Sequence, residues 1–130
     1  MIEKSCVLVV EDEPDLRDLL VEVLRDENFE VREAANVSDA KKLLENPGTF
    51  PNKIHCVLAD YFLGGPTGLD LIQWVRTQSQ TLPHLKDLVF ALSASEGAPR
   101  EEELKKRGAN HVFYKPIDFK TFPAWVRGLK

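Results

Sequence analysis

The segment CVLVVEDEPDLRDLL, residues 6–20, runs from a purely apolar stretch through a cluster of acids into a helical pattern. Residues 6–10 are apolar throughout, which is typical of a strand covered on both faces of a sheet. Leu16, Leu19 and Leu20 begin a stripe at the spacing of an amphipathic helix, continued by Val23 and Leu24. The acids at 11–13 lie between the two, so their mutual repulsion needs a compensating charge.

The same alternation continues along the chain. Strand-like runs occupy residues 5–10, 29–34, 55–59, 87–92 and 111–115. Helical patterns lie between and after them, at 16–24, 37–44 (ended by NPG at 46–48), 69–76, 97–109 and 119–129. This order predicts an α/β fold with a doubly wound, five-stranded parallel sheet of the flavodoxin-like type, with strand order 2-1-3-4-5. The run at 29–34 alternates polar and apolar residues, which favours an edge strand.

Length and composition narrow the function classes. The 130 residues suit a single domain, and a net charge of −4 argues against direct binding to nucleic acid or an anionic membrane. No apolar run is long enough to span a bilayer, and the N-terminus lacks the features of a signal peptide, so we expect a cytoplasmic protein. Cys6 and Cys56 lie in strand-like runs and are expected to be buried thiols.

Polar side chains stand at the ends of four of the five predicted strands. Glu11 and Asp12 follow the first strand, Asp60 the third, Ser93 the fourth and Lys115 the fifth. The carboxyl ends of parallel strands meet at one edge of the sheet, so these side chains should converge on one crevice. Each has a simpler alternative when taken alone: a helix cap for Asp12, Glu13 or Ser93, a turn for Asp60, a solvated strand end for Lys115.

The converging set suits phosphoryl transfer. Carboxylates gathered without His or Cys favour Mg²⁺, or Mn²⁺, as the ion that offsets the acidic cluster. Asp60 could then act as a nucleophile toward phosphorus, with Lys115 neutralising charge and Ser93 donating a hydrogen bond to a phosphoryl oxygen. Without the ion, one carboxylate should have a raised pKa.

These motifs resemble the receiver domain of bacterial two-component response regulators. The resemblance rests on VLVVEDEP at 7–14, Gly68 eight residues after Asp60, LSAS at 92–95 and KP at 115–116, and it covers essentially the whole chain. It implies a phospho-acceptor, a metal site, a phosphoryl-binding pair and a candidate cis-proline. The resemblance makes Asp60 the phospho-acceptor and Pro116 the candidate cis-proline. The implied metal ligands are Glu11, Asp12, Asp60 and the backbone carbonyl of Phe62. The implied phosphoryl-binding residues are Ser93 and Lys115.

The resemblance also implies a partner set and a mode of action. The chain is expected to be one receiver domain, 1–130, without an effector domain, either stand-alone or excised from a longer protein. It would be a signalling switch rather than an enzyme, catalysing only its own phosphorylation and dephosphorylation. A sensor histidine kinase or phosphotransfer domain would supply the phosphoryl group. A downstream protein would read a surface on helix 4, strand 5 and helix 5, to which Trp125, Val112 and Ala98 are candidate contributors, and activation could bring dimerisation.

Three positions depart from the family pattern. Val112 stands at the switch position, three residues before the lysine, where the family usually has an aromatic side chain. Gly64 replaces a proline four residues after the acceptor and predicts a more flexible loop. Phe62 lies two residues after Asp60, where its ring would overhang an acyl phosphate and exclude water, so we expect a long-lived phospho-form.

Three alternative functions fit the sequence less well than a phosphorylated receiver domain. A degenerate receiver that is never phosphorylated and serves as a constitutive docking module would explain Val112 and Gly64, but it has no need of the five site residues. A haloacid-dehalogenase-type phosphatase would carry D-x-D after the first strand, where this chain has EDEP. A flavodoxin would need a Ser-, Thr- and Gly-rich phosphate loop there instead of acids.

Overall fold

The architecture is that of a computed structural model, which describes residues 6–45 and 54–129. The strands are Cys6–Val10 (β1), Glu30–Ala34 (β2), Ile54–Asp60 (β3), Val89–Ala94 (β4) and His111–Tyr114 (β5). The helices are Pro14–Asp26 (α1), Val37–Glu45 (α2), Gly68–Gln78 (α3), Glu101–Lys106 (α4) and Thr121–Arg127 (α5), with a 3₁₀ turn, η2, at Pro83–Leu85.

The five strands form one parallel sheet in the order β2-β1-β3-β4-β5. This confirms the doubly wound, flavodoxin-like order predicted from the sequence. The order reverses between β1 and β3, so the crevice beside this reversal lies at the carboxyl ends of the central strands. The alternating strand β2 lies at an edge, as its pattern predicted.

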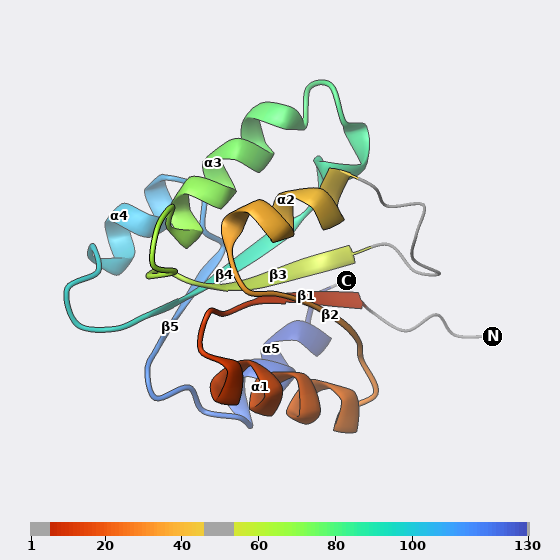
Figure 1. Ribbon diagram of the computed structural model, residues 1–130, viewed down its shortest axis with the longest axis vertical. Helices are drawn as coiled ribbons and strands as arrows, with labels where there is room; N and C mark the ends of the chain where they lie inside the picture. Colours follow the sequence, from red (N-terminus) through yellow and green to blue (C-terminus); the bar gives the residue numbers. More distant parts are fainter. Residues whose placement is uncertain (1–5, 46–53, 130) are drawn as a thin grey trace.

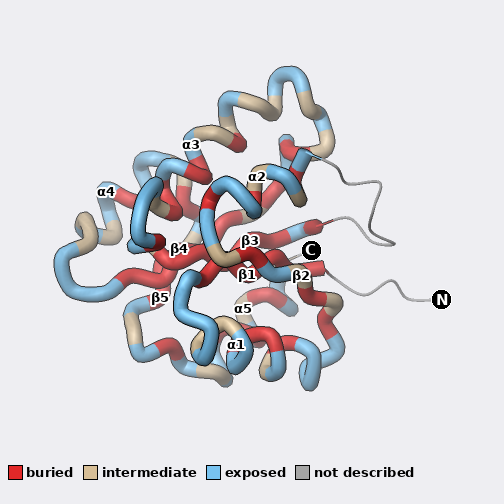
Figure 2. The backbone as a smooth tube through the Cα atoms, viewed as in Figure 1, coloured by how far each residue is buried: buried red, intermediate tan, exposed pale blue. Residues whose placement is uncertain are grey.

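Helices cover both faces of the sheet (Figure 1): α1 and α5 lie on one side, and α2, α3 and α4 on the other. Successive side chains of a strand point to opposite faces. Leu8 and Val10 of β1 therefore join the core under α2, α3 and α4, while Val7 and Val9 join the core under α1 and α5. Figure 2 shows the resulting buried layer through the strands.

The helices differ in detail from the predicted ones. Leu19, predicted on the apolar stripe of α1, is 42% exposed, because the buried face of that helix is carried by Leu20, Val21 and Leu24. Helix α4 is shorter than the predicted 97–109, because the backbone turns at Gly97 with φ +95° before the helix begins. The NPG at 46–48 lies outside the described residues.

Pro123 lies inside α5, as its sequence position required. It is the third residue of the helix, where its missing N–H would have had no partner within the helix. Cys6 and Cys56 are both buried free thiols, as expected, and burial raises the pKa of Cys56 to about 12.

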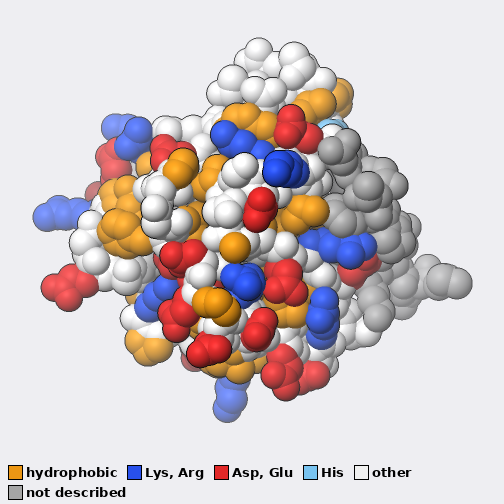
Figure 3. All heavy atoms as spheres, viewed as in Figure 1, with side chains coloured by type: hydrophobic (Ala, Val, Ile, Leu, Met, Phe, Trp, Pro, Cys, Tyr) orange, Lys and Arg blue, Asp and Glu red, His pale blue; other side chains and the backbone are white. Residues whose placement is uncertain are grey.

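The surface is mixed in charge. On the face shown in Figure 3, acidic and basic side chains of the described residues are interspersed and do not gather into one basic patch. Within residues 6–45 and 54–129, none of the helices has the length and apolar character needed to cross a bilayer.

Candidate functional site

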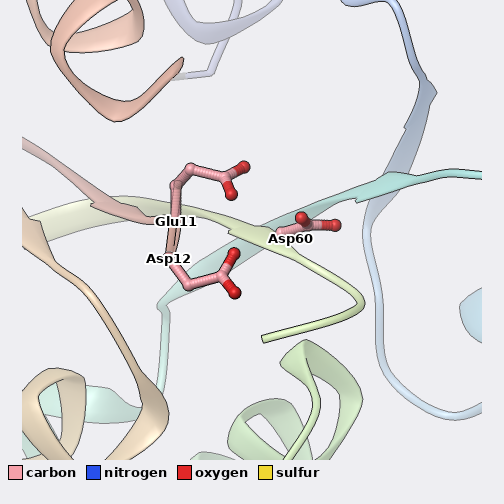
Figure 4. A group of neighbouring side chains, drawn as sticks. All are labelled: Glu11, Asp12 and Asp60. Atoms are coloured by element: carbon pink, nitrogen blue, oxygen red, sulfur yellow. The ribbon is translucent and has the colours of Figure 1, made fainter. Parts of the chain in front are cut away.

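The structure brings the side chains at the strand ends together. Asp60 is the last residue of β3 and pairs in register with Ser93 of β4. Lys115, just after β5, donates from Nζ to Asp60 Oδ2 at 2.7 Å and lies 3.5 Å from Glu11 Oε1. Carboxylate oxygens of Glu11, Asp12 and Asp60 lie within 4.8 Å of one another, and Figure 4 shows their side chains grouped at the ends of β1 and β3.

Burial separates the members of this group. Glu11, Asp60 and Ser93 are the buried polar residues of the described chain, with 2%, 5% and 2% of their surface exposed, whereas Asp12 is exposed. Two buried carboxylates are unfavourable unless charge or hydrogen bonds compensate. Lys115, with 24% of its side chain exposed, supplies the first compensating charge.

Hydrogen bonds hold the acidic turn after β1. The Glu11 N–H donates to the Ala34 carbonyl at 3.0 Å, and the Glu13 N–H donates to Glu11 Oε2 at 3.2 Å. Arg17, from the first turns of α1, donates from Nη1 to the Glu11 carbonyl at 2.8 Å and from Nε to Glu33 Oε1 at 3.2 Å. Sequence reasoning missed Arg17, although it is the one base among the acids of residues 11–24.

The simpler alternatives do not describe the acids or Ser93. Glu13 holds the N-cap position of α1, yet no side-chain hydrogen bond caps that helix. Ser93 caps no helix either, because α4 begins only at Glu101 with Arg100 at its N-cap.

Close packing fixes the segment after Asp60. The Tyr61 N–H donates to the Ser93 carbonyl at 2.9 Å, and the Gly68 N–H donates to the Tyr61 carbonyl at 3.0 Å. Thr67 then caps α3 in a reciprocal capping box with Asp70. A Cβ on Gly68 would lie 2.5 Å from the Asp60 carbonyl oxygen, so only glycine allows α3 to approach the end of β3 this closely.

Gly64 has a specific conformational role in the same loop. Its φ of +74° lies in the left-handed region, and a Cβ there would lie 3.7 Å from Asp12 Oδ2. Proline, with φ fixed near about −65°, cannot adopt this conformation. A proline at this position is therefore incompatible with the backbone conformation of this loop.

The electrostatics of the buried pair follow from burial and proximity. Burial raises the pKa of Glu11 to about 7, the neighbouring charge of Asp60 adds to this, and the Glu13 N–H and Lys115 oppose it. Burial by itself would lower the pKa of Lys115, but the hydrogen bond to Asp60 and the charges of Asp60 and Glu11 outweigh it, so this pKa is raised. Lys115 is thus held in its charged form.

The donor set fits a hard divalent cation. Asp60 Oδ1 is buried and has no hydrogen-bond partner among the described residues, while Oδ2 is held by Lys115. Together with Glu11 and Asp12, Asp60 forms a group of three carboxylates without His or Cys. Mg²⁺ prefers such oxygen ligands and commonly takes one or two carboxylates.

The Phe62 ring lies between Tyr61 and the segment after β4. The Phe62 side chain is 43% exposed and packs edge-on against Tyr61, with ring centroids 4.8 Å apart. Its Cζ lies 3.8 Å from where a Cβ on Gly97 would stand, so the ring reaches the β4–α4 connection.

The three residues expected on the output surface differ in how far they are buried. Val112 is 5% exposed and belongs to the core under α2, α3 and α4, so its expected place on the surface is wrong. Trp125 is half-buried and stacks on His111 with centroids 5.2 Å apart, while Ala98 packs partly against the core. Tyr114, two residues beyond Val112, is 55% exposed. The Lys115–Pro116 peptide bond is cis.

Comparison with known proteins places this arrangement in a family. The family model of the response regulator receiver domain matches residues 7–127. Response regulator RppA of Synechocystis is 35% identical over 124 residues, covering 95% of this chain and 50% of that protein. Response regulator protein PilR of Pseudomonas aeruginosa is 31% identical over 117 residues, covering 90% and 24%. The chain therefore spans about half the length, or less, of these two relatives.

Solved structures show the same fold. The chemotaxis response regulator CheY4 of Vibrio cholerae superimposes with a TM-score of 0.79 at 22% identity, covering 96% of this chain and 98% of that one. A response regulator receiver protein of Pseudomonas putida gives 0.79 at 21% identity, covering 98% of both. With a family match over nearly its full length, this chain belongs to the response regulator receiver domains.

Proposed function

We propose that this chain accepts a phosphoryl group on Asp60 in a Mg²⁺-dependent reaction. Receiver domains are phosphoryl-accepting switches of two-component systems, and they generally bind Mg²⁺. The observation that carries the proposal for this chain is the buried, unpartnered Asp60 Oδ1 beside a charged Lys115 and two further carboxylates. A buried carboxylate oxygen without a partner is unfavourable unless it serves binding or chemistry.

The donor is proposed to be a phosphohistidine of a sensor histidine kinase or phosphotransfer domain. A carboxylate oxygen of Asp60 forms a bond to phosphorus while the phosphorus–nitrogen bond breaks. The electron pair of that bond stays on the imidazole nitrogen, which takes up a proton from solvent. Glu11, Asp12, Asp60 and the Phe62 carbonyl are the proposed ligands of Mg²⁺, which when bound supplies positive charge to the transferred group.

Lys115 and Ser93 are the proposed phosphoryl-binding residues. Lys115 lies 2.7 Å from Asp60 Oδ2, so its ammonium group can pass from the carboxylate to an oxygen of the transferred group. Ser93 stands beside Asp60 in the sheet register and carries a hydroxyl donor. Both therefore compensate charge that appears when Asp60 is modified.

The proposed output is a change in the surface formed by α4, β5 and α5, read by a downstream protein. Phosphorylation adds about −1.5 to −2 charges and three acceptor oxygens at the end of β3. Helix α4 has six residues, of which only Leu104 is buried. A short helix with one buried side chain is the element most readily shifted by a change at the neighbouring β4 end.

Incubation with Mg²⁺ and acetyl phosphate, followed by intact-mass spectrometry, tests the proposal. We expect a mass gain of one phosphoryl group that is absent without Mg²⁺ and absent in Asp60→Asn. A chain that gains no mass and binds no Mg²⁺ would contradict it.

One observation favours a second candidate, the constitutive docking module. Val112 replaces the family's aromatic switch residue and is buried, so it cannot report on the site by a ring rotation. A docking module would bind its partner equally well with and without phosphorylation. Affinity for a partner that rises on phosphorylation would exclude it.

A further inference from the structure

Arg17 reaches from α1 to the peptide that carries the acidic turn. Its Nη1 donates to the Glu11 carbonyl at 2.8 Å, and its Nε donates to Glu33 Oε1 at 3.2 Å. The Arg17 side chain is 19% exposed and that of Glu33 is 42% exposed. The guanidinium therefore spans three elements: α1, β2 and the turn after β1.

A surface ion pair with Glu33 alone would have little consequence, because exposed pairs of this kind contribute little to stability. The hydrogen bond to Glu11 is different, since its acceptor is the backbone oxygen of a buried residue. The guanidinium is a rigid fork, so it can hold a carbonyl and a carboxylate in one fixed geometry.

Holding this carbonyl fixes the place of Asp12. The Glu11 carbonyl and the Asp12 nitrogen and Cα belong to one planar peptide unit. The preceding peptide is fixed as well, because the Glu11 N–H donates to the Ala34 carbonyl at 3.0 Å. Two successive peptide planes are thus tied to β2 and α1. Asp12 is exposed, so its backbone is what places its carboxylate within 4.8 Å of those of Glu11 and Asp60.

We propose that Arg17 is a positioning residue for the divalent-cation site, acting through the Glu11–Asp12 peptide. The proposal rests on the proposed Mg²⁺-dependent function but concerns a residue outside the ligand set. Arg17 can affect the affinity of the site for a cation in two opposite ways. As a positive charge near the site, Arg17 would weaken cation binding; as the anchor of the peptide, it strengthens cation binding.

Isothermal titration of Mg²⁺ into the unphosphorylated protein distinguishes these effects. Arg17→Met removes the charge and both hydrogen bonds, and Arg17→Lys keeps the charge but not the fork. Arg25→Met is the matched control, because Arg25 is an exposed base in the last turn of the same helix. Removing groups that orient metal ligands typically weakens metal binding by about 10–100-fold.

We expect Arg17→Met to bind Mg²⁺ about tenfold more weakly, Arg17→Lys to fall between it and the wild type, and Arg25→Met to match the wild type. Tighter or unchanged binding in Arg17→Met would overturn the proposal. Should Arg17→Met fail to fold by circular dichroism, Arg17→Lys carries the test, and wild-type affinity in that variant would overturn it.

A second measurement separates positioning from a general structural defect. The rate of phosphorylation by acetyl phosphate is followed against Mg²⁺ concentration. In Arg17→Lys we expect the half-saturating Mg²⁺ concentration to rise while the rate at saturating Mg²⁺ stays near wild type. A lowered rate with unchanged half-saturation would contradict positioning.

Failure of the proposed function would look different. If the wild type binds Mg²⁺ and Arg17→Met weakens that binding, but no phosphoryl group is accepted, then the role of Arg17 stands and the phospho-acceptor proposal fails. If the wild type is phosphorylated and Arg17→Met binds Mg²⁺ normally, the phospho-acceptor proposal stands and the proposed role of Arg17 fails.

Discussion

Gly68→Ala is expected to destabilise the protein although it introduces one methyl group. The new Cβ would lie 2.5 Å from the Asp60 carbonyl oxygen and 2.7 Å from Leu92 Cδ2. An ordinary contact begins near 3.4 Å, so the gap to the carbonyl must widen by about 0.9 Å, which is 3.4 minus 2.5. The carbonyl belongs to β3 and cannot rotate away as a side chain could. Overpacking of this kind costs about 1–3 kcal/mol.

A matched control isolates the steric part. Gly65 lies three residues earlier, a Cβ added to it would meet no atom within 4 Å, and its φ lies outside the left-handed region. Both substitutions reduce the entropy of the unfolded chain equally, which stabilises by about 0.4–1 kcal/mol. Gly65→Ala should therefore be neutral or slightly stabilising, and the difference between the two variants reports the contact with Asp60.

Urea unfolding of both variants, followed by circular dichroism, measures this difference. We expect Gly68→Ala to be less stable than Gly65→Ala by about 1–3 kcal/mol. We also expect slower phosphorylation in Gly68→Ala, because relief of the clash moves the end of β3. Equal stability of the two variants would refute the reasoning that α3 packs directly on the acceptor's backbone.

Three further predictions concern the charges and the ring at the site. Phe62→Asn should shorten the lifetime of the phospho-form, measured as loss of the added mass after the phosphodonor is removed; an unchanged decay rate removes the water-exclusion idea. The pKa of Glu11, raised from 4.5 to about 7, means that the folded state holds this proton more tightly than the unfolded state. Its contribution to stability is therefore complete below the unfolded pKa and is lost as pH rises through about 7, by at most about 3 kcal/mol. Urea titrations without Mg²⁺ from pH 4.5 to 8 should show this loss, and Glu11→Gln should abolish it. Lys115→Met leaves two buried carboxylates without their cation, so we expect stability at pH 8 to fall by about 1–3 kcal/mol and Mg²⁺ to restore part of it; no loss would show that Lys115 does not compensate them.

The sheet was predictable because its strands carry a strong local signal. Residues 6–10 and 56–59 are apolar throughout and occupy the central strands, while the alternating 30–34 lies at the edge. Strand order followed from the alternation of elements, and with it the meeting of Asp60, Ser93 and Lys115 at one edge.

Side-chain contacts between different helices and strands could not be predicted from the sequence. Arg17 reads as one polar residue on an amphipathic helix, and only the crossing of α1 over β2 brings it to Glu11 and Glu33. Leu19 fits the apolar stripe of α1, yet the rotation of the helix on the sheet leaves it exposed. Such rotations depend on packing rather than on periodicity.

The backbone conformation and the burial of single residues could not be predicted from the sequence either. The sequence marked Gly64 as a departure from the family pattern, but it did not show that this residue adopts a φ of +74°, in the left-handed region that glycine favours. Val112 was a candidate contributor to the surface on helix 4, strand 5 and helix 5, but this apolar side chain of β5 is buried in the core.

The location of the phosphoryl group tests the central claim most directly. After reaction with acetyl phosphate and Mg²⁺, reduction with borohydride converts an acyl phosphate of aspartate to homoserine, which tandem mass spectrometry of the peptides can locate. Our account predicts homoserine at position 60 and nowhere else. Homoserine at position 12 instead, or no reduced residue in a protein that has gained the phosphoryl mass, would contradict it.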